Sequence, residues 1–447
     1  MTHRSILEWG RIPVGEGGFS RLQAERLLAA CRQHPLGGVD GAAILTDHHR
    51  WLRSQQMVGM VAVEDCSLEI LPKIDGLGDP ETATGRAKLR ERLVHMLDVA
   101  LGLDIGLGRE TAMAQQDETL LDILIAAFAD QLATAVRRGL PRQYLACEGD
   151  LTVLRGRLDV TRQFTTLLTR PDRLACRYDV LSADHALLQI MKCCAVFLFR
   201  HARRAETRRR LTELRLALSE ITDVRPQALR WDAVRIDRSN VRWRSLLTLA
   251  RLFLRRAWQG THRGADPDNA PGVTLLFPMN DLFEAYVAAL LRSALAPEGY
   301  EVVTQGGLRH CLVELAADGT PGRGLFQTKP DCLVRKNGRT VLVLDTKWKQ
   351  LAARVDDPKR GVAQGDIYQL MAYARLYDCD RLMLLYPYCD GLERQGVLAG
   401  HRINAPGASE RLEIAALDIT VDRARAVGAL QEIVAPVAQR DLAPGFA

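Results

Sequence analysis

The triplet Lys329-Pro330-Asp331 is followed by the turn signal Lys336-Asn337-Gly338-Arg339 and then by Val341-Leu342-Val343-Leu344-Asp345-Thr346-Lys347. An Asn-Gly pair between two apolar runs predicts a β-hairpin. Residues 341–344 predict a buried strand that ends in a carboxylate and an ammonium. Charged side chains are rarely buried unless they are paired or bind a metal. We therefore expect a functional site at the end of this strand.

The register of this hairpin decides whether the two carboxylates can act together. A two-residue loop at Asn337-Gly338 places Asp331 and Asp345 on opposite faces of the sheet. A three-residue loop, or one β-bulge, aligns them on one face. We predict an odd loop or a bulge for this reason. Lys347 then shares the face of Asp345, and Thr346 points away.

Two aspartates on one face attract a hard divalent cation. Mg²⁺ binds one or two carboxylates, keeps several water ligands and accepts backbone carbonyls. We predict Mg²⁺ at Asp331 and Asp345, with the carbonyl of Thr346 as a third ligand. Such an ion polarises a phosphodiester and helps to deprotonate water, and Lys347 would orient that water or stabilise the developing negative charge. The alternative, an exposed hairpin with ordinary surface charges, conflicts with the apolar run before Asp345.

Three more polar side chains lie at helical spacings near this segment. Glu284 edges the apolar face of a predicted helix, from which it can reach the same metal or its water. The alternative is a surface glutamate favoured by the helix dipole. Gln369 and Tyr373 are four residues apart and share a helix face, from which they can bind a phosphate or brace Lys347. Plain surface packing is the alternative for this pair.

The length of the chain sets its organisation. With 447 residues and about 150 residues per domain, we expect roughly three domains. The segment 259–272, QGTHRGADPDNAPG, is rich in Gly and Pro, so we place a domain boundary there. We predict an N-terminal mixed α/β domain at 1–110, a helical, basic middle region at 111–260 and a C-terminal domain at 273–447. The fold class is α/β (α+β), with a central mixed sheet flanked by helices in the C-terminal domain.

Hydrophobic periodicity predicts the individual elements. Ser182 is the predicted N-cap of a long helix that follows it. Further helices are expected in the basic segment, one of them ending near Trp258. The predicted helices otherwise span residues 18–33, 84–103, 118–140, 183–203, 280–294, 365–377 and 421–438. The predicted strands lie at 57–63, 67–73, within 143–159, and at 174–181, 300–304, 309–315, 331–335, 340–344, 381–386 and 411–415.

Missing signals exclude several classes of protein. No apolar run reaches the roughly 18 residues that a membrane helix needs, and residues 1–11 do not resemble a signal peptide. The ten cysteines form no C-x-x-C pair, so no zinc ribbon or thioredoxin-like site is expected. No Walker nucleotide-binding loop occurs. We expect a cytoplasmic protein without a membrane span, in which His48 and His49 are surface or structural residues and Trp348 is a packing residue.

Positive charge is concentrated in one segment. The formal net charge of the chain is +6, and residues 200–260 hold 16 Arg and no Lys against 6 Asp and Glu. This segment therefore carries +10 and the remainder about −4. A phosphate-binding surface is one interpretation, because guanidinium groups bind phosphate bidentately. A solvated helical face is the other, and composition does not decide between them.

The candidate residues resemble those of known nucleases. Asp331, Asp345 and Lys347 are similar to the PD-(D/E)XK nuclease core, and Gln369 with Tyr373 resembles the Q-x-x-x-Y element of one branch of that superfamily. The motifs Phe277-Pro-Met-Asn-Asp-Leu-Phe-Glu-Ala-Tyr-Val287, Asp345-Thr-Lys-Trp-Lys349 and Asp366-Ile-Tyr-Gln369 resemble McrC, the nuclease subunit of McrBC-type restriction systems. Weaker matches extend this resemblance over most of the chain: Leu68-Glu-Ile-Leu-Pro-Lys-Ile74, Arg155-Gly-Arg-Leu-Asp159, and Cys176-Arg-Tyr-Asp179 with Leu181-Ser-Ala-Asp184.

The resemblance implies a Mg²⁺-dependent endonuclease subunit that cleaves double-stranded DNA while docked on an McrB-like hexameric AAA+ GTPase. It also implies that the chain stimulates GTP hydrolysis by that partner, which agrees with the missing Walker loop. The N-terminal region is the implied docking region, with no contact residue assigned. Compared with compact members of the family, we expect extra residues in the helical middle, where the basic segment lies, so the resemblance does not decide whether this segment contacts DNA, the motor or only solvent. The implied catalytic residues are Glu284, Asp331, Asp345, Lys347, Gln369 and Tyr373.

Two other functions compete with this one. The chain can be an interaction protein that activates the motor and has little or no nuclease activity of its own. The presence of all four catalytic residues, Glu284, Asp331, Asp345 and Lys347, argues against this. A stand-alone repair nuclease is the other alternative, and the large N-terminal portion without a recognisable DNA-binding motif argues against it.

Overall fold

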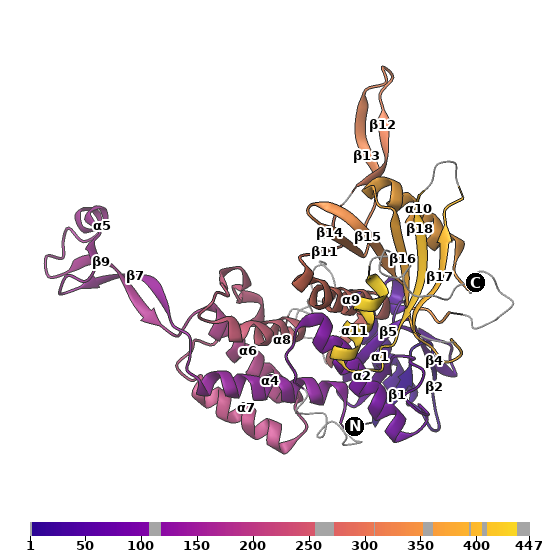
Figure 1. Ribbon diagram of the computed structural model, residues 1–447. Coiled ribbons are helices and arrows are strands. Elements are labelled where there is room, and N and C mark those ends of the chain that lie inside the picture. Colours follow the sequence, from indigo (N-terminus) through magenta and orange to yellow (C-terminus); the bar gives the residue numbers. More distant parts are fainter. Residues whose placement is uncertain are drawn as a thin grey trace. The chain divides into compact units, whose positions relative to one another are not determined.

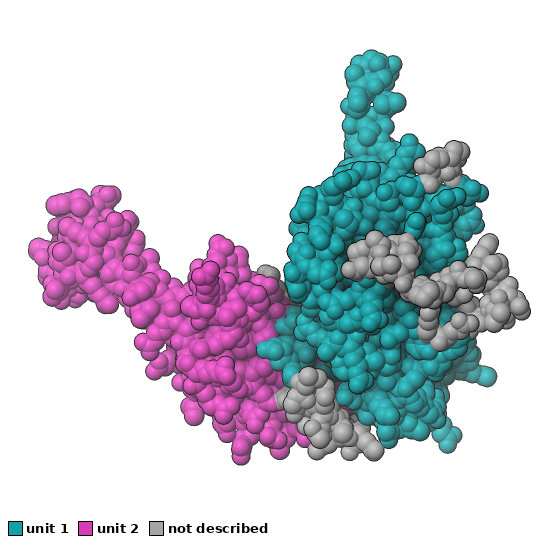
Figure 2. Space-filling model, viewed as in Figure 1, with its two compact units in different colours: residues 1–117, 276–447 teal, residues 118–275 magenta. Residues whose placement is uncertain are grey.

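The computed structural model describes residues 2–106, 118–254, 272–307, 309–351, 361–392, 395–404 and 409–435. The chain divides into two compact units: unit 1 comprises residues 1–117 and 276–447, and unit 2 comprises residues 118–275 (Figure 2). The predicted segments 1–110 and 273–447 thus fall almost entirely in one unit. The predicted helix end near Trp258 and nearly all of the predicted boundary at 259–272 lie outside the described residues.

The N-terminal part of unit 1 is built around a four-stranded sheet, in which β1 runs parallel to β6 and β5 runs antiparallel to β6. Helix α1 begins at a capping box between Ser20 and Gln23. It packs Leu27 and Leu28 into the apolar core that it shares with β5 and β6. The elements are β1 (Thr2–Leu7), β6 (Cys66–Leu71), β5 (Met57–Val63) and β10 (Gly272–Pro278) in sheet order, a small sheet of β2 (Arg11–Pro13), β4 (Trp51–Ser54) and β3 (Leu45–Asp47), and α1 (Arg21–Arg32).

The C-terminal part of unit 1 contains a six-stranded mixed sheet, as predicted. The neighbours β15, β16 and β18 run parallel, and β11, β14 and β17 pair antiparallel with their neighbours. The sheet order is β11 (Glu301–Thr304), β14 (Cys332–Lys336), β15 (Arg339–Thr346), β16 (Arg381–Pro387), β18 (Arg411–Leu417) and β17 (Gly396–Arg402).

Helices flank this sheet. Helix α10 (Gln364–Tyr377) packs on β15 and β16, and α9 (Met279–Leu295) packs on β11 and β15. Helices α2 (Ala83–Leu101) and α11 (Arg423–Val434) contact α9 in turn. The hairpin of β12 (His310–Leu315) and β13 (Pro321–Gln327) projects beyond the sheet (Figure 1). Its side chains Leu312, Leu315 and Phe326 are exposed.

Unit 2 is a helical bundle with a projecting sheet. The bundle consists of α4 (Leu120–Arg137), α6 (Ala186–His201), α7 (Ala205–Ala217) and α8 (Arg244–Leu254). The three-stranded sheet β7 (Gln143–Leu151), β9 (Leu174–Ser182) and β8 (Arg157–Leu158) extends away from these helices and carries α5 (Val160–Thr165) (Figure 1). We call residues 143–182 the arm.

One predicted helix start is wrong. Ser182 does not cap α6, which begins at Ala186 after His185. The reason is that Ser182 still belongs to β9, and its hydroxyl accepts the backbone N–H of Asp184 at 3.0 Å. Among the described residues, no helix combines the length and apolar character that a membrane span needs.

Part of the basic segment is neutralised within unit 2. Arg204 pairs with Glu118, and Arg210 pairs with both Asp130 and Glu206. The guanidinium groups of Arg208 and Arg215 lie over the ring of Phe199, 5.1 and 5.0 Å from its centre. These contacts show that several arginines have structural roles on the bundle surface.

Candidate active site

The turn between β14 and β15 contains two residues. Asn337 and Gly338 have φ angles of 51° and 80°, as a type I′ hairpin requires, and the residues on either side of them pair directly. If this register continued regularly, Asp331 and Asp345 would lie on opposite faces of the sheet.

A β-bulge changes that register. The pairing shifts between Val334 and Arg335, and Cys332 then pairs with Leu344. The two aspartates occupy the next position on each chain. The predicted bulge is therefore confirmed, and it brings both carboxylates to the same end of the hairpin.

Asp331 is held by the residue that follows Asp345. Its Oδ2 accepts the backbone N–H of Thr346 at 2.7 Å and the hydroxyl of Thr346 at 2.8 Å. The prediction that the Thr346 side chain points away is therefore wrong: Asp331 lies beyond the end of β14, so its carboxylate can reach Thr346. Burial raises the pKa of Asp331, and the two hydrogen bonds from Thr346 act in the opposite direction. The role of the Thr346 carbonyl as a metal ligand stays a prediction.

Asp345 is 1% exposed at the end of β15. Its pKa is raised to about 6, first by burial and then by the negative charge of Asp331. Its Oδ2 lies 2.7 Å from the ammonium of Lys347, so these two side chains lie together, as predicted. Two close carboxylates are only partly balanced by one ammonium, and a bound cation would relieve the remaining repulsion.

Helix α10 presents Gln369 and Tyr373 to this cluster. The amide nitrogen of Gln369 lies 2.7 Å from the Tyr373 hydroxyl and 3.4 Å from Oδ1 of Asp345. The predicted shared face is thus confirmed. Tyr373 also forms a hydrogen bond with the backbone of Lys329, so α10 contacts both the Lys329-Pro330-Asp331 segment and the end of β15.

Asp366, in the first turn of α10, belongs to the same cluster and was not predicted as a site residue. Its carboxylate oxygens lie 3.6 Å from the ammonium of Lys347 and 3.4 Å from that of Lys349. Lys347 is therefore held between Asp366 and Asp345. The three-residue spacing from Asp366 to Gln369 was the available signal, because it places both on one side of a helix.

Glu284 on α9 completes the cluster on the side of Asp331. The pKa of Glu284 is raised to about 7, first by burial and then by the charge of Asp331, and a hydrogen bond with Gln305 opposes this shift. Gln305, which the sequence did not indicate, also donates its backbone N–H to the carbonyl of Asp331 at 3.2 Å. All six predicted catalytic side chains thus lie in one region of unit 1.

The donor atoms of this cluster fit Mg²⁺. Within the described ranges, no group of three or more His, Cys, Asp or Glu side chains is arranged to hold a metal ion. Mg²⁺ does not need such a group, because it keeps water ligands and also binds substrate phosphates. Asp331 and Asp345 offer hard oxygen donors, and the raised pKa of Asp345 shows that its charge is poorly compensated by the protein alone.

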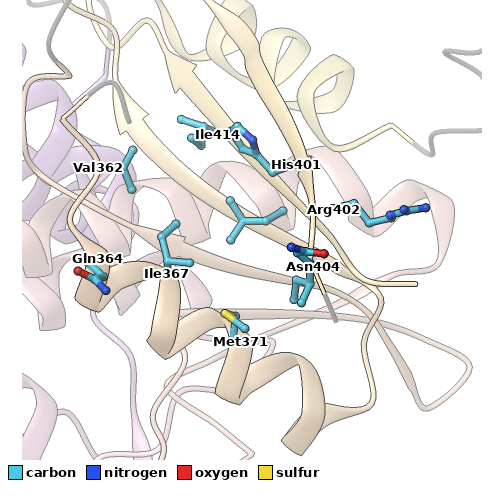
Figure 3. A pocket seen from close by; sticks show the side chains of 10 residues that line it. Val362, Gln364, Ile367, Met371, His401, Arg402, Asn404 and Ile414 are labelled. Carbon is cyan, nitrogen blue, oxygen red and sulfur yellow. The ribbon is translucent and has the colours of Figure 1, made fainter. Parts of the chain in front are cut away.

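A pocket of about 600 Å³ lies beside α10 (Figure 3). Apolar side chains of α10 and β18 and polar side chains from the end of β17 line it, among them Ile367, Met371, His401, Arg402 and Ile414. None of the six predicted catalytic residues does. The pocket is therefore distinct from the candidate active site.

His48 and most of the cysteines have structural environments. His48 stacks on Trp51 with ring centres 5.8 Å apart and hydrogen-bonds the hydroxyl of Thr46. None of the ten cysteines, all of which lie in the described ranges, forms a disulfide, and seven of them are buried. Burial of a thiol raises its pKa, as for Cys31, where the value reaches about 12. Such thiols are unreactive.

Comparison with known protein families gives the class of this protein, a restriction-system component. A family model described as "McrBC 5-methylcytosine restriction system component" matches residues 52–387, and the chain belongs to this family. No curated protein sequence matches the chain.

Two solved structures resemble the fold of this McrC-like chain. One is a chain of the refined half-complex from the tetradecameric assembly of Thermococcus gammatolerans McrB AAA+ hexamers with bound McrC. It is 19% identical, with a TM-score of 0.66, over 97% of this chain and 100% of that chain. The other comes from the cryo-EM structure of the Thermococcus gammatolerans McrBC complex. It is 22% identical, with a TM-score of 0.52, over 66% of this chain and 88% of that chain.

Proposed function

We propose that this protein is the nuclease subunit of a McrBC-like restriction complex, a Mg²⁺-dependent enzyme that hydrolyses phosphodiester bonds of double-stranded DNA. The observation that carries the proposal is the cluster of Asp331, Asp345 and Lys347 at the end of β15. Buried charge pairs are often no more stabilising than apolar side chains of similar volume. Perturbed carboxylates grouped in this way are typical of functional sites.

Each side chain has a role that its contacts support. Asp331 and Asp345 would hold Mg²⁺, which when bound polarises the scissile phosphate and favours deprotonation of water. Lys347 would donate hydrogen bonds to the phosphate oxygen that gains negative charge. Glu284, with a pKa of about 7, would accept a proton from the attacking water, because a general base works best with a pKa near the operating pH.

Gln369 and Tyr373 would act on the same reaction from α10. The Gln369 amide links the Asp345 carboxylate to the Tyr373 hydroxyl. It would fix the direction of that carboxylate or bind a phosphate oxygen. Such positioning is effective because small displacements of reacting groups lower the rate strongly.

We also infer that the chain docks on an AAA+ hexamer and stimulates its GTP hydrolysis. The most extensive of the two structural similarities reported above is to a chain of an assembly of McrB AAA+ hexamers with bound McrC. In this chain the arm exposes Tyr144, Phe164 and Leu168 by 73%, 66% and 69%. Exposed apolar side chains on a projecting element are candidates for an interaction surface. We propose that the arm contacts the motor, in addition to the N-terminal region expected from the resemblance.

The same arm supports a second candidate function. The chain would then be an activator of the AAA+ motor with little or no nuclease activity of its own. The exposed apolar surface of the arm favours docking, and it says nothing for or against DNA cleavage.

A plasmid-cleavage assay separates the two functions. The wild type and Asp345→Ala are mixed with Mg²⁺, GTP and the AAA+ protein encoded beside this chain, on modified and unmodified DNA. Cutting and GTP hydrolysis are followed in the same samples. We expect the variant to lose cutting and to stimulate hydrolysis as the wild type does.

Other results would change the assignment. Stimulated hydrolysis without cutting by the wild type on any DNA would support the activator. Equal cutting by the wild type and Asp345→Ala would remove the candidate site from the chemistry.

A further inference from the structure

Trp348, the residue after Lys347, connects two parts of unit 1. Its side chain is 7% exposed, and its ring packs edge-on against Phe283 with centres 5.5 Å apart. The indole N–H donates to Oε1 of Glu8 at 2.8 Å. The Trp348 carbonyl accepts the side-chain amide of Gln56 at 3.2 Å. Glu8 and Gln56 both come from the N-terminal sheet region, so residues 340 and 292 positions earlier in the chain hold the end of the catalytic strand β15.

Glu8 is also held by residues of the N-terminal sheet region. The backbone N–H of Glu8 donates to the carbonyl of Leu71 at 2.8 Å, and Oε1 of Glu8 accepts the backbone N–H of Lys73 at 2.9 Å. These contacts tie Glu8 to the end of β6. The acceptor that meets the Trp348 indole therefore has a set position in the N-terminal sheet.

Glu8 is costly to bury for a purely structural residue. It is 3% exposed, and burial raises its pKa. Its second oxygen, Oε2, is buried without a hydrogen-bond partner among the described residues. An unsatisfied buried polar group costs about 1–3 kcal/mol. Fold stability therefore does not account for a glutamate at this position.

The backbone around Lys347 is held at two neighbouring positions. The backbone N–H of Lys347 donates to the carbonyl of Leu385 in β16 at 2.9 Å. This hydrogen bond fixes the Lys347 backbone at the end of β15. The next anchor along the chain is Trp348, held by Glu8. Lys347 thus leaves the sheet between two fixed points, and its ammonium reaches Asp345 from there.

We propose that Glu8 is a positioning residue for the nuclease reaction: through Trp348 it fixes the backbone at Lys347 and so the direction of the Lys347 ammonium. This inference rests on the proposed function. The N-terminal sheet then does more than dock a partner, since it also supports the catalytic strand. A displacement of about 1 Å at a reacting group lowers a rate by up to roughly 100-fold.

A double-mutant cycle in the complete complex tests the proposal. Rates of plasmid cutting with Mg²⁺, GTP and the AAA+ partner are measured against DNA concentration for Glu8→Ala, Trp348→Phe and the double variant. Trp348→Phe keeps an aromatic ring and removes the indole N–H together with part of the ring volume. We expect each single change to lower kcat by about tenfold without changing KM, and the double change to lower it no further, because both remove one interaction.

Two further variants separate positioning from stability. Glu8→Gln keeps a carbonyl acceptor, so it should recover most of the rate. Glu69→Gln alters another buried carboxylate of the same sheet, on β6, which hydrogen-bonds Arg90 of α2. It should lower Tm and leave kcat per folded molecule unchanged. Where Glu8→Ala fails to fold, Trp348→Phe and Glu8→Gln carry the test.

Hydrogen–deuterium exchange provides a readout that does not depend on cutting. Amides of residues 347–349 should exchange faster in Glu8→Ala and Trp348→Phe than in the wild type, and Glu69→Gln should leave them unchanged. Unchanged exchange, additive losses of kcat, or full kcat per folded molecule in the single variants would overturn the positioning role. Absence of cutting by the wild type, with the exchange pattern as expected, would instead overturn the nuclease function on which the inference rests.

Discussion

The ammonium of Lys347 lies 2.7 Å from Oδ2 of Asp345, two positions earlier in the chain. This pairing places a positive charge next to a carboxylate that is buried at the end of a strand. The geometry is therefore set before any substrate arrives, as electrostatic stabilisation of a transition state requires.

Replacement of this ammonium should stop the chemistry without disturbing the partner. For Lys347→Met we expect cutting to fall about 100- to 1,000-fold, as for loss of a preorganised donor to a developing oxyanion. Lys347→Arg should restore little, because its planar fork does not reproduce a point charge. Single-turnover plasmid cleavage measures the effect, and GTP hydrolysis by the partner should not change. Cutting at the wild-type rate by Lys347→Met would assign the chemistry to other residues.

Asp366 should support Lys347 from the other side. Asp366→Asn removes the charge 3.6 Å from the ammonium and leaves a side chain of the same size. We expect about a tenfold loss of cutting, from looser positioning. Asp318→Asn, at an exposed turn where Asp318 bonds Thr320, is the matched control and should cut normally. An equal effect in both variants would show that general charge, rather than this contact, matters.

The arm should be required for stimulation of the motor. Phe164→Ala with Leu168→Ala removes two exposed apolar side chains of the arm, so the fold should be unaffected. We expect the increase in partner GTP hydrolysis that this chain causes to fall at least tenfold, and the rate of cutting to fall with it. Phe326→Ala removes a side chain that is 71% exposed on the β12–β13 hairpin and serves as the control. Full stimulation by the arm variant would place the docking surface elsewhere.

The buried pair of Glu69 and Arg90 should dominate the stability of the N-terminal sheet. Two hydrogen bonds of 2.8 and 2.6 Å join them, and their side chains are 0% and 6% exposed. Arg90→Met should cost about 3–5 kcal/mol, because it removes the cation that balances the buried Glu69 carboxylate and leaves the Ser5 hydroxyl to donate to it. Chemical denaturation measures this free energy of unfolding. The double variant Glu69→Gln/Arg90→Met should be more stable than Arg90→Met alone; a further loss would show that the charges are not coupled.

His95 should make unfolding depend on pH. Burial, followed by the charges of Arg92 and Arg423, lowers the pKa of His95 to about 4 from 6.5. The unfolded chain therefore binds a proton at a higher pH than the folded chain, and stability is lost as pH falls from about 6.5 to about 4. We expect a loss on the order of 1–3 kcal/mol from this side chain. Chemical denaturation at several pH values between these limits gives the free energy of unfolding as a function of pH. This free energy should fall less steeply with decreasing pH in His95→Gln than in the wild type, and an equal fall in both would contradict the assignment.

The core of the site was predictable because it is local. The strand at 341–344 and the Asn-Gly turn have strong short-range signals, and the need to align Asp331 with Asp345 predicted the bulge. The face shared by Gln369 and Tyr373 follows from helical spacing alone. These residues therefore take their relative positions mainly from the secondary structure in which they lie.

The rest of the site depends on tertiary contacts. Gln305 follows β11 and contacts Asp331, and Glu8 follows β1 and contacts Trp348. No periodicity marks either residue. The orientation of Thr346 differs from strand alternation because Asp331 lies outside β14 and turns toward it. Short strands such as β2 and β3, with three residues each, carry too little pattern to be predicted. Unit 1 is also discontinuous in the chain, which hydrophobic patterns do not reveal.

This discontinuity sets an order of events during synthesis. The N-terminal sheet receives β10 next to β5 only after all of unit 2 has left the ribosome. Until then β5, whose seven residues are all buried in the finished fold, is an apolar edge strand open to wrong pairing. A chain that stops before Gly272 would therefore not fold into an independent N-terminal domain. A truncated variant of this region should include β10.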